Sequence, residues 1–78
     1  MLFEFSNHSV EQIKMRSISK EIVELVIKEP DKIIIEDDNQ QIFQKVVENY
    51  LYRVLTNNNN SPLLIKTVYR TSKIAKYL

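Results

Sequence analysis

The chain has 78 residues, no cysteine, a single histidine, a net charge of +1 and 27% charged residues. This is the composition of one small globular domain covering residues 1–78. It excludes disulfides, thiolate metal sites and histidine-rich zinc sites, so we expect neither a metal nor a cofactor. A chain of this length buries only about 60% of its unfolded surface, so packing or a partner must supply its stability.

The beginning of the chain, MLFEFSNHS, lacks the basic start and the long apolar stretch of a signal peptide. The longest apolar runs, such as Ile33 to Ile35, are too short to span a bilayer. We therefore expect a cytoplasmic protein with no membrane contact.

The chain contains no glycine, which excludes a glycine-rich phosphate loop. Asn and Asp at 37–40 and 57–60 are therefore expected to occupy the turn positions that need positive φ.

The first part of the chain predicts a short strand and two helices. Residues 2–5 are expected to form a short edge strand. A helix is predicted from about 9 to 16, with Ser6, Asn7 and Ser9 as candidate N-caps, because Ser9 and Gln12 match a capping box. Ser19 is expected to start a second helix, with apolar residues recurring at helical spacing, and Pro30 is expected to end it.

After Pro30 the apolar residues follow the period of a strand. Four runs rich in β-branched and aromatic residues predict strands at 32–35, 41–47, 50–56 and 63–71. Glu48 and Asn49 are expected to form a tight hairpin turn, and the four asparagines a longer loop. Residues after Thr71 are expected to form a basic tail. The fold class is therefore α+β, with two N-terminal helices packed on a curved antiparallel sheet of about four strands.

The sequence leaves the facing of the strand residues open. If residues 57–60 form a four-residue loop, Arg53 faces the same way as Lys66 and Arg70. A loop longer by one residue would instead place Arg53 with Thr67 and Tyr69, since a slip of one residue reverses every side chain.

Four segments of the chain resemble a known family of small bacterial domains: SNHSVEQIKMRSIS, EIVELVIKEPDKI, QKVVENYLYRVL and IKTVYRTSKIAKY. The family pattern runs from Ser-x-His through a helix ending in Arg-Gly-Ile-Ser to strands that close with Thr-x-Tyr-Arg-Thr-Ser. Ser17 stands where this pattern has glycine. The family is related in turn to the RelE/ParE and BrnT toxins, so the resemblance implies their fold, two helices against a curved sheet.

The same resemblance implies a metal-independent endoribonuclease that belongs to a toxin–antitoxin pair. Such a protein would cleave RNA, in some cases on the ribosome, and would be held inactive by a cognate antitoxin. Two alternatives stay open, a non-catalytic protein-binding module with a toxin-like fold and a ParE-like gyrase inhibitor. The edge strands of a small sheet could also pair with an antitoxin segment or with a second copy in a homodimer.

Metal-independent cleavage of RNA needs a base for the 2′-hydroxyl, cations for the transition state and an acid for the leaving oxygen. His8 is the candidate base, because the positive end of a helix would favour its neutral form. Arg53 and Arg70 are the candidate cations, because a guanidinium grips phosphate through two parallel hydrogen bonds. Tyr69 is the candidate acid. This catalytic hypothesis requires His8, Arg53 and Arg70 to converge on one shallow hollow.

The stretch from Lys66 to Lys76 contains four cations and no acidic residue, which indicates a local surface for phosphate. Each candidate also has a purely structural alternative. His8 could only pack, the strand cations could keep an exposed sheet face soluble, and the tyrosine and threonines could only build strands. The candidate RNA-binding residues are Lys45, Lys66, Thr67, Thr71 and Lys73.

Overall fold

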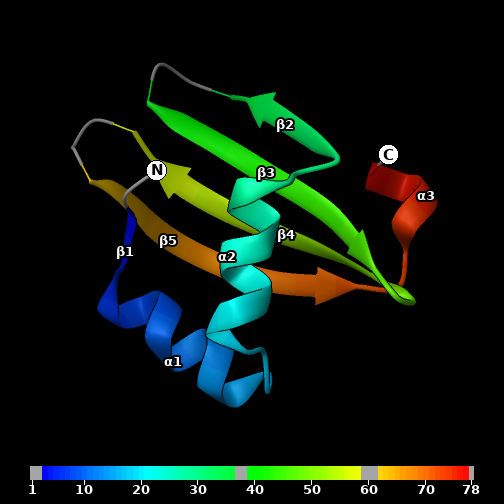
Figure 1. The fold of residues 1–78 in the computed structure, drawn as a ribbon, viewed down its shortest axis with the longest axis horizontal. Coiled ribbons are helices and arrows are strands. Elements are labelled where there is room, and N and C mark those ends of the chain that lie inside the picture. The colour runs from blue at the N-terminus through cyan, green and yellow to red at the C-terminus, as the bar shows by residue number, and fades with distance from the viewer. Residues whose placement is uncertain (1–2, 37–38, 59–61, 78) are drawn as a thin grey trace.

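The computed structural model describes residues 3–36, 39–58 and 62–77, which form an α+β fold (Figure 1). The predicted fold class is confirmed. Among the described residues, no helix has the length and apolar character needed to cross a membrane. The elements are β1 (Phe3–Phe5), α1 (Asn7–Met15), α2 (Lys20–Lys28), β2 (Lys32–Ile35), β3 (Gln40–Val47), β4 (Tyr50–Asn57), β5 (Leu63–Thr71) and α3 (Ile74–Tyr77).

The five strands form one mixed sheet in the order β1-β5-β4-β3-β2. Strands β2 to β5 make the predicted antiparallel meander. The short N-terminal strand lies at the edge as expected, but it pairs in parallel with β5 and so adds a fifth strand. Helix α2 lies across one face of this sheet against β3 and β4, and α1 packs alongside β5 and β1 (Figure 1).

The core fills the space between these two helices and the sheet. Its sheet residues alternate along each strand, so Tyr52 and Val54 of β4 point to the helices and Arg53 points away. We call the side that carries Arg53 and faces away from α1 and α2 the Arg53 face. The buried apolar residues of the core are Ile13, Ile18, Val23, Val26, Ile27, Phe43, Tyr52, Val54, Ile65 and Val68.

Helix α1 begins at Asn7, two residues earlier than predicted, because Ser6 and not Ser9 is its N-cap. The backbone N–H of Ser9 donates to Oγ of Ser6 over 3.1 Å, and Oγ of Ser9 donates back to the Ser6 carbonyl over 2.8 Å. Ser9 is fully buried, so both of its polar groups are used inside the first turn.

Helix α1 ends in a Schellman motif that accounts for the RSIS segment. Ser17 is left-handed, with φ of 54°, and its N–H donates to the carbonyl of Lys14 over 3.3 Å. The next N–H, of Ile18, donates to the carbonyl of Ile13 over 2.9 Å, and both isoleucines enter the core. Ser19 then caps α2 as predicted, since its Oγ accepts from the N–H of Ile22.

The residues with positive φ are not those that the sequence suggested. In the described ranges they are Ser17 and Glu48, the latter in the predicted hairpin turn at φ of 58°. Asn57 and Asn58 are described and have no positive φ, so this expectation is wrong for them. The φ angle of Asn39 depends on residue 38, which lies outside the described residues. The other expected positions, 37, 38, 59 and 60, lie outside the described residues.

Replacing Ser17 with glycine is expected to stabilise the fold. The left-handed conformation costs a residue with a Cβ about 1–2 kcal/mol, and glycine avoids this cost. The greater freedom of glycine in the unfolded chain takes back roughly 0.5–1 kcal/mol of the stability gained. A net gain of 1 kcal/mol would raise the melting temperature of a domain this small by about 4–8 °C. Thermal unfolding followed by circular dichroism measures it, with Ser17→Ala as a control that keeps the Cβ. A lower melting temperature for Ser17→Gly would contradict this account of the turn.

A β-bulge between β4 and β5 decides which side chains share a face. Leu55 pairs with Thr67 but the next residue, Thr56, pairs with Ile65, so Lys66 is the extra residue of β5. Beyond the bulge Arg53 pairs with Tyr69. Of the two alternatives for Arg53, the one that places it on the same face as Thr67 and Tyr69 is therefore correct. The cause is a bulge within β5 instead of a longer loop.

Candidate functional site

The guanidinium of Arg53 is held between two neighbouring strands on the Arg53 face. Its cross-strand partners are Gln44 of β3 and Tyr69 of β5. Nε of Arg53 donates to Oε1 of Gln44 over 2.7 Å, and Nη1 donates to the hydroxyl of Tyr69. Both contacts follow directly from the strand register, because residues that pair directly lie on the same face.

The third side of this site comes from α3. Gln44 has no exposed surface, and its Nε2 donates to the backbone carbonyl of Tyr77 over 3.3 Å. The ring of Tyr77 lies 4.2 Å from the guanidinium carbon of Arg53, and the Tyr69 ring lies 5.6 Å from it. We call Gln44, Arg53, Tyr69 and Tyr77 the Arg53 cluster. Its guanidinium is fixed by a buried amide, a hydroxyl and an aromatic face.

The charge of Arg53 has no carboxylate partner in the part of the chain that the structure describes, where the single ion pair joins Lys45 and Asp31. Arg53 is half-buried, and its hydrogen-bond partners Gln44 and Tyr69 are neutral. Its Nη2, which carries two N–H donors, makes no hydrogen bond to any described residue. A fixed, partly desolvated guanidinium of this kind attracts an anion such as a phosphate group.

Several predicted site residues lie on the same face as this cluster. Thr67 pairs with Leu55 and Thr71 pairs with Leu51, which places both threonines on the Arg53 face with Tyr69. Oγ1 of Thr71 accepts from the N–H of Lys73 over 3.1 Å, so Thr71 also turns the chain from β5 toward α3. Lys73 is exposed at this turn.

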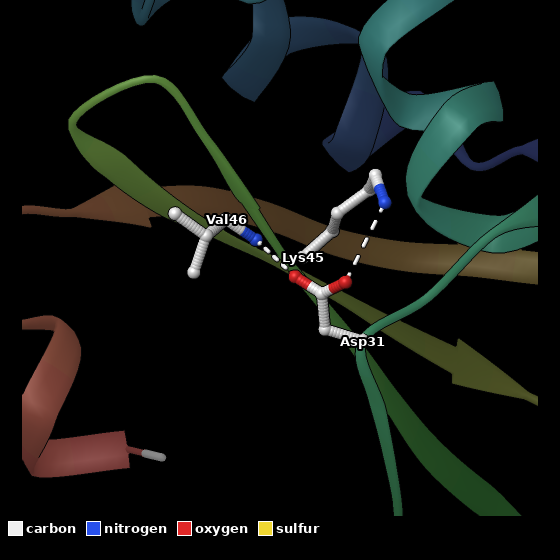
Figure 2. Close-up of polar contacts among 3 residues, drawn as sticks. All are labelled: Asp31, Lys45 and Val46. Atoms are coloured by element: carbon white, nitrogen blue, oxygen red, sulfur yellow. Dashed lines mark hydrogen bonds and ion pairs between the residues drawn. The ribbon is translucent and has the colours of Figure 1, made fainter.

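Two predicted cations lie on the opposite, helix-covered face. Arg70 pairs with Tyr52, and its guanidinium carbon lies 5.1 Å from the ring of Tyr50. Lys45 also pairs with Tyr52, and its Nζ lies 3.5 Å from the carboxylate of Asp31 (Figure 2). The structure therefore separates Arg70 and Lys45 from Arg53 by the thickness of the sheet.

The Asp31 carboxylate that binds Lys45 is itself fixed to β3. It accepts the backbone N–H of Val46 over 2.8 Å (Figure 2). This hydrogen bond, helped by the charge of Lys45 and opposed by burial, lowers the pKa of Asp31 below its usual value. Lys45 thus has a structural partner, and the pair ties the start of β2 to β3.

His8 does not join the Arg53 cluster. It is exposed in the first turn of α1, which contacts β5 and β1, whereas Arg53 lies in β4 with its side chain on the face turned away from the core. Arg70 is also remote from it. The start of α1 lies beside Ile65, through the bond from Ser6 N–H to its carbonyl, whereas the far end of α1 reaches Val68 through Arg16. The structure does not bring His8, Arg53 and Arg70 to one hollow.

Lys66 occupies the bulge and has no pairing partner on β4. Its carbonyl accepts from Oγ of Ser6 over 3.4 Å, so its backbone helps to hold the start of α1. Its side chain is half-buried. Lys66 shares neither a strand pair nor a recorded contact with the Arg53 cluster.

Sequence reasoning missed two members of the cluster, Gln44 and Tyr77. Gln44 directly follows the apolar residues Ile42 and Phe43, and an amide that is buried among such residues needs a specific hydrogen-bond partner. Tyr77 falls in the segment that the sequence predicts to be a basic tail. The segment after Ser72 contains Lys73, Ala75 and Lys76, and its strong helix formers were the signal for the short helix α3.

The chain matches the model of one protein family, a domain of unknown function named DUF4258, over residues 5–70. The chain belongs to the DUF4258 family. No curated protein and no solved structure is similar enough to the chain to match it. The span matched by this DUF4258 domain contains Gln44, Arg53 and Tyr69, whereas Tyr77 lies beyond it.

Proposed function

We propose that this DUF4258 domain binds RNA at the Arg53 cluster and cleaves it as a metal-independent endoribonuclease, the toxin of a toxin–antitoxin pair. One observation carries the proposal: Arg53 is held rigidly by neutral groups and has no carboxylate partner in the described residues. The resemblance to RelE and BrnT toxins supplies the reaction type, and a cognate antitoxin would be its partner in the cell.

The cluster offers two features that suit a single-stranded RNA. The free donor edge of Arg53 can hold a phosphate oxygen, because a guanidinium presents several N–H groups in one plane. Tyr69 beside it supplies an aromatic face for a base. The exposed cations Lys73 and Lys76, which lie between Tyr69 and Tyr77 in the sequence, would add positive charge near the RNA backbone.

His8 and Arg70 do not reach the cluster, so the catalytic set expected from the sequence is not assembled there. We instead assign the cleavage step to Arg53 and Tyr69 alone. The 2′-oxygen attacks the neighbouring phosphorus, the bond from phosphorus to the 5′-oxygen breaks, and a 2′,3′-cyclic phosphate forms. Arg53 would stabilise the charge on the phosphoryl oxygens, and the hydroxyl of Tyr69 would give its proton to the departing 5′-oxygen. Water would take the proton of the 2′-hydroxyl and later restore that of Tyr69. A missing general base costs about 10²–10⁴-fold in rate, so a slow enzyme is expected.

RNA binding is tested with two arginines that the fold places on opposite faces, each beside a tyrosine. Arg53→Gln is expected to weaken binding of a single-stranded RNA by about 10–100-fold, the cost of losing a charged hydrogen bond. Binding should also release about one counterion fewer, which changes the slope of log affinity against log salt concentration by roughly 0.7. Arg70→Gln should change affinity less than about threefold, since weak surface charges contribute little. Fluorescence anisotropy with a 2′-O-methyl RNA measures binding, because this RNA cannot be cleaved.

Circular dichroism spectra and thermal melts must show that both variants are folded. Equal losses of affinity in the Arg53 and Arg70 variants would contradict a site on the Arg53 face. An RNA affinity that neither substitution changes would contradict RNA binding at the cluster altogether.

A further inference from the structure

Strand β2 ends the sheet with an open apolar edge. It is last in the strand order, and no other strand lies on its outer side in the described ranges. Ile33 is 47% exposed and Ile35 is 72% exposed. A β-branched edge of this kind carries neither a proline nor a bulge within the strand to protect it, and such an edge is a template for pairing with another strand.

The hydrogen-bond pattern shows which backbone groups point outward. The N–H of Glu36 donates to the carbonyl of Gln40 on β3 over 3.1 Å. Since bonded and non-bonded pairs alternate in an antiparallel ladder, Ile34 and Lys32 also direct their backbone groups toward β3. The N–H and C=O groups of Ile33 and Ile35 therefore point to the open edge.

The sequence of this edge is self-complementary when it is read antiparallel. It runs Lys32, Ile33, Ile34, Ile35, Glu36. We propose that β2 pairs with β2 of a second copy of this chain about a two-fold axis at Ile34. Ile33 then pairs with Ile35 of the second copy, and Lys32 lies opposite Glu36 of the second copy, twice in the dimer.

This register satisfies the backbone and the charges together. Ile33 and Ile35 form the two hydrogen-bonded pairs, with four bonds in all from the outward groups, and Ile34 forms the non-bonded pair at the axis. A slip of two residues in either direction preserves the backbone pattern. It would, however, set Lys32 or Glu36 opposite an isoleucine of the second copy and leave both charge pairs unmade. Opposite charges directly across a pair of strands are favourable.

The proposed dimer has a consequence for the arrangement of the Arg53 clusters. Lys32 pairs with Gln44, so Lys32, Ile34 and Glu36 lie on the Arg53 face, and Ile33 and Ile35 lie on the helix side. An axis at the edge and perpendicular to the sheet joins two five-stranded sheets into one of ten strands. Both Arg53 clusters then lie on the same face. The inference about β2 does not depend on RNA binding.

Charge reversal at the two ends of β2 tests the pairing. Lys32→Glu leaves only acidic charges across the axis and Glu36→Lys leaves only basic ones, so each single variant is expected to raise the dimer dissociation constant by at least about tenfold. The two single variants mixed in equal amounts should form a mixed dimer, and the double variant Lys32→Glu with Glu36→Lys should dimerise like the original chain. Sedimentation equilibrium over a concentration series measures all four, because so short an edge predicts a weak interface.

Two controls make the result decisive. Lys14→Glu changes the charge equally at an exposed position of α1 and should leave the dissociation constant unchanged. Amide exchange should show that protection of Ile33 and Ile35 rises with protein concentration while protection of Ile34 does not. A chain that stays monomeric at every concentration overturns the proposal, even if its RNA binding is intact. Dimers that all variants form equally well also overturn it.

Discussion

Replacing Tyr69 with phenylalanine is expected to slow RNA cleavage by about 10²–10⁴-fold, the usual contribution of a positioned general acid. The substitution removes one hydroxyl, which receives a hydrogen bond from Arg53 and lies on the Arg53 face. The ring and the guanidinium remain, so RNA affinity should fall by less than about tenfold, since one hydrogen bond of a charged group is affected. Single-turnover cleavage of an end-labelled RNA, with and without ribosomes, measures the rate. Detection of a 2′,3′-cyclic phosphate identifies the product.

His8→Ala is the matched control for this prediction. His8 is exposed in the first turn of α1, whose start is bonded to Ile65, and Tyr69 lies four residues further along β5 on the Arg53 face. The loss of His8 should therefore leave the cleavage rate within about threefold, as for a surface change away from the site. A rate that falls in His8→Ala and not in Tyr69→Phe would contradict the assignment of Tyr69 and support His8 as the base.

Induced expression of the chain in bacteria is an independent test of its function. Growth arrest with DNA damage and no loss of RNA would point to gyrase, and a harmless chain that cuts no RNA would point to a binding module.

Helices α1 and α2 and the four strands after Pro30 could be predicted from the sequence, because their residue types and end signals are clear. Ser19 caps α2 as its hydroxyl and position suggested, and Pro30 follows the helix it was expected to end. The predicted bounds of β2 and β5 agree with the structure. These signals are local, since each depends on a few neighbouring residues and the backbone geometry that they favour.

The composition of the site could not be predicted, because it depends on register and on contacts between distant segments. Because of the bulge at Lys66, Arg53 pairs with Tyr69 and not with Arg70. Helix α3 packs near β4 and so places the ring of Tyr77 against Arg53. A single extra residue in one strand changes every pairing beyond it, and strand periodicity carries no mark of where the extra residue lies. The chemistry of RNA cleavage selected His8, Arg53, Arg70 and Tyr69 as candidate catalytic residues. Residue chemistry alone does not show which of them lie on the same face of the sheet.

At Ser17 the departure of the sequence from the family pattern does indicate a structural feature, a left-handed residue in a turn. The family pattern has glycine there, and the backbone at Ser17 is left-handed. Glycine takes this conformation without the Cβ penalty. The buried Ile18 and the two backbone bonds of the Schellman motif hold the turn in place despite the serine.

Replacing the buried Gln44 with leucine is expected to destabilise the domain by about 1–3 kcal/mol, the cost of leaving buried or charged hydrogen-bonding groups without partners. Leucine has a similar volume, but it cannot accept from Nε of Arg53 or donate to the carbonyl of Tyr77. Arg53 would lose its fixed orientation, so RNA affinity should fall together with stability. Urea unfolding measures the loss, with Gln41→Leu on the same strand as a control expected to change stability by less than about 0.5 kcal/mol.

Gln44→Glu separates the two roles of this residue. A carboxylate can still accept from Nε of Arg53, so the guanidinium stays in place, but its charge is now balanced from within the protein. Because the anion site depends on an uncompensated charge, RNA affinity should fall about as far as in Arg53→Gln. If Gln44→Glu binds RNA as tightly as the original chain, the charge of Arg53 is not what attracts the phosphate. The cluster would then be a structural connection between the sheet and α3.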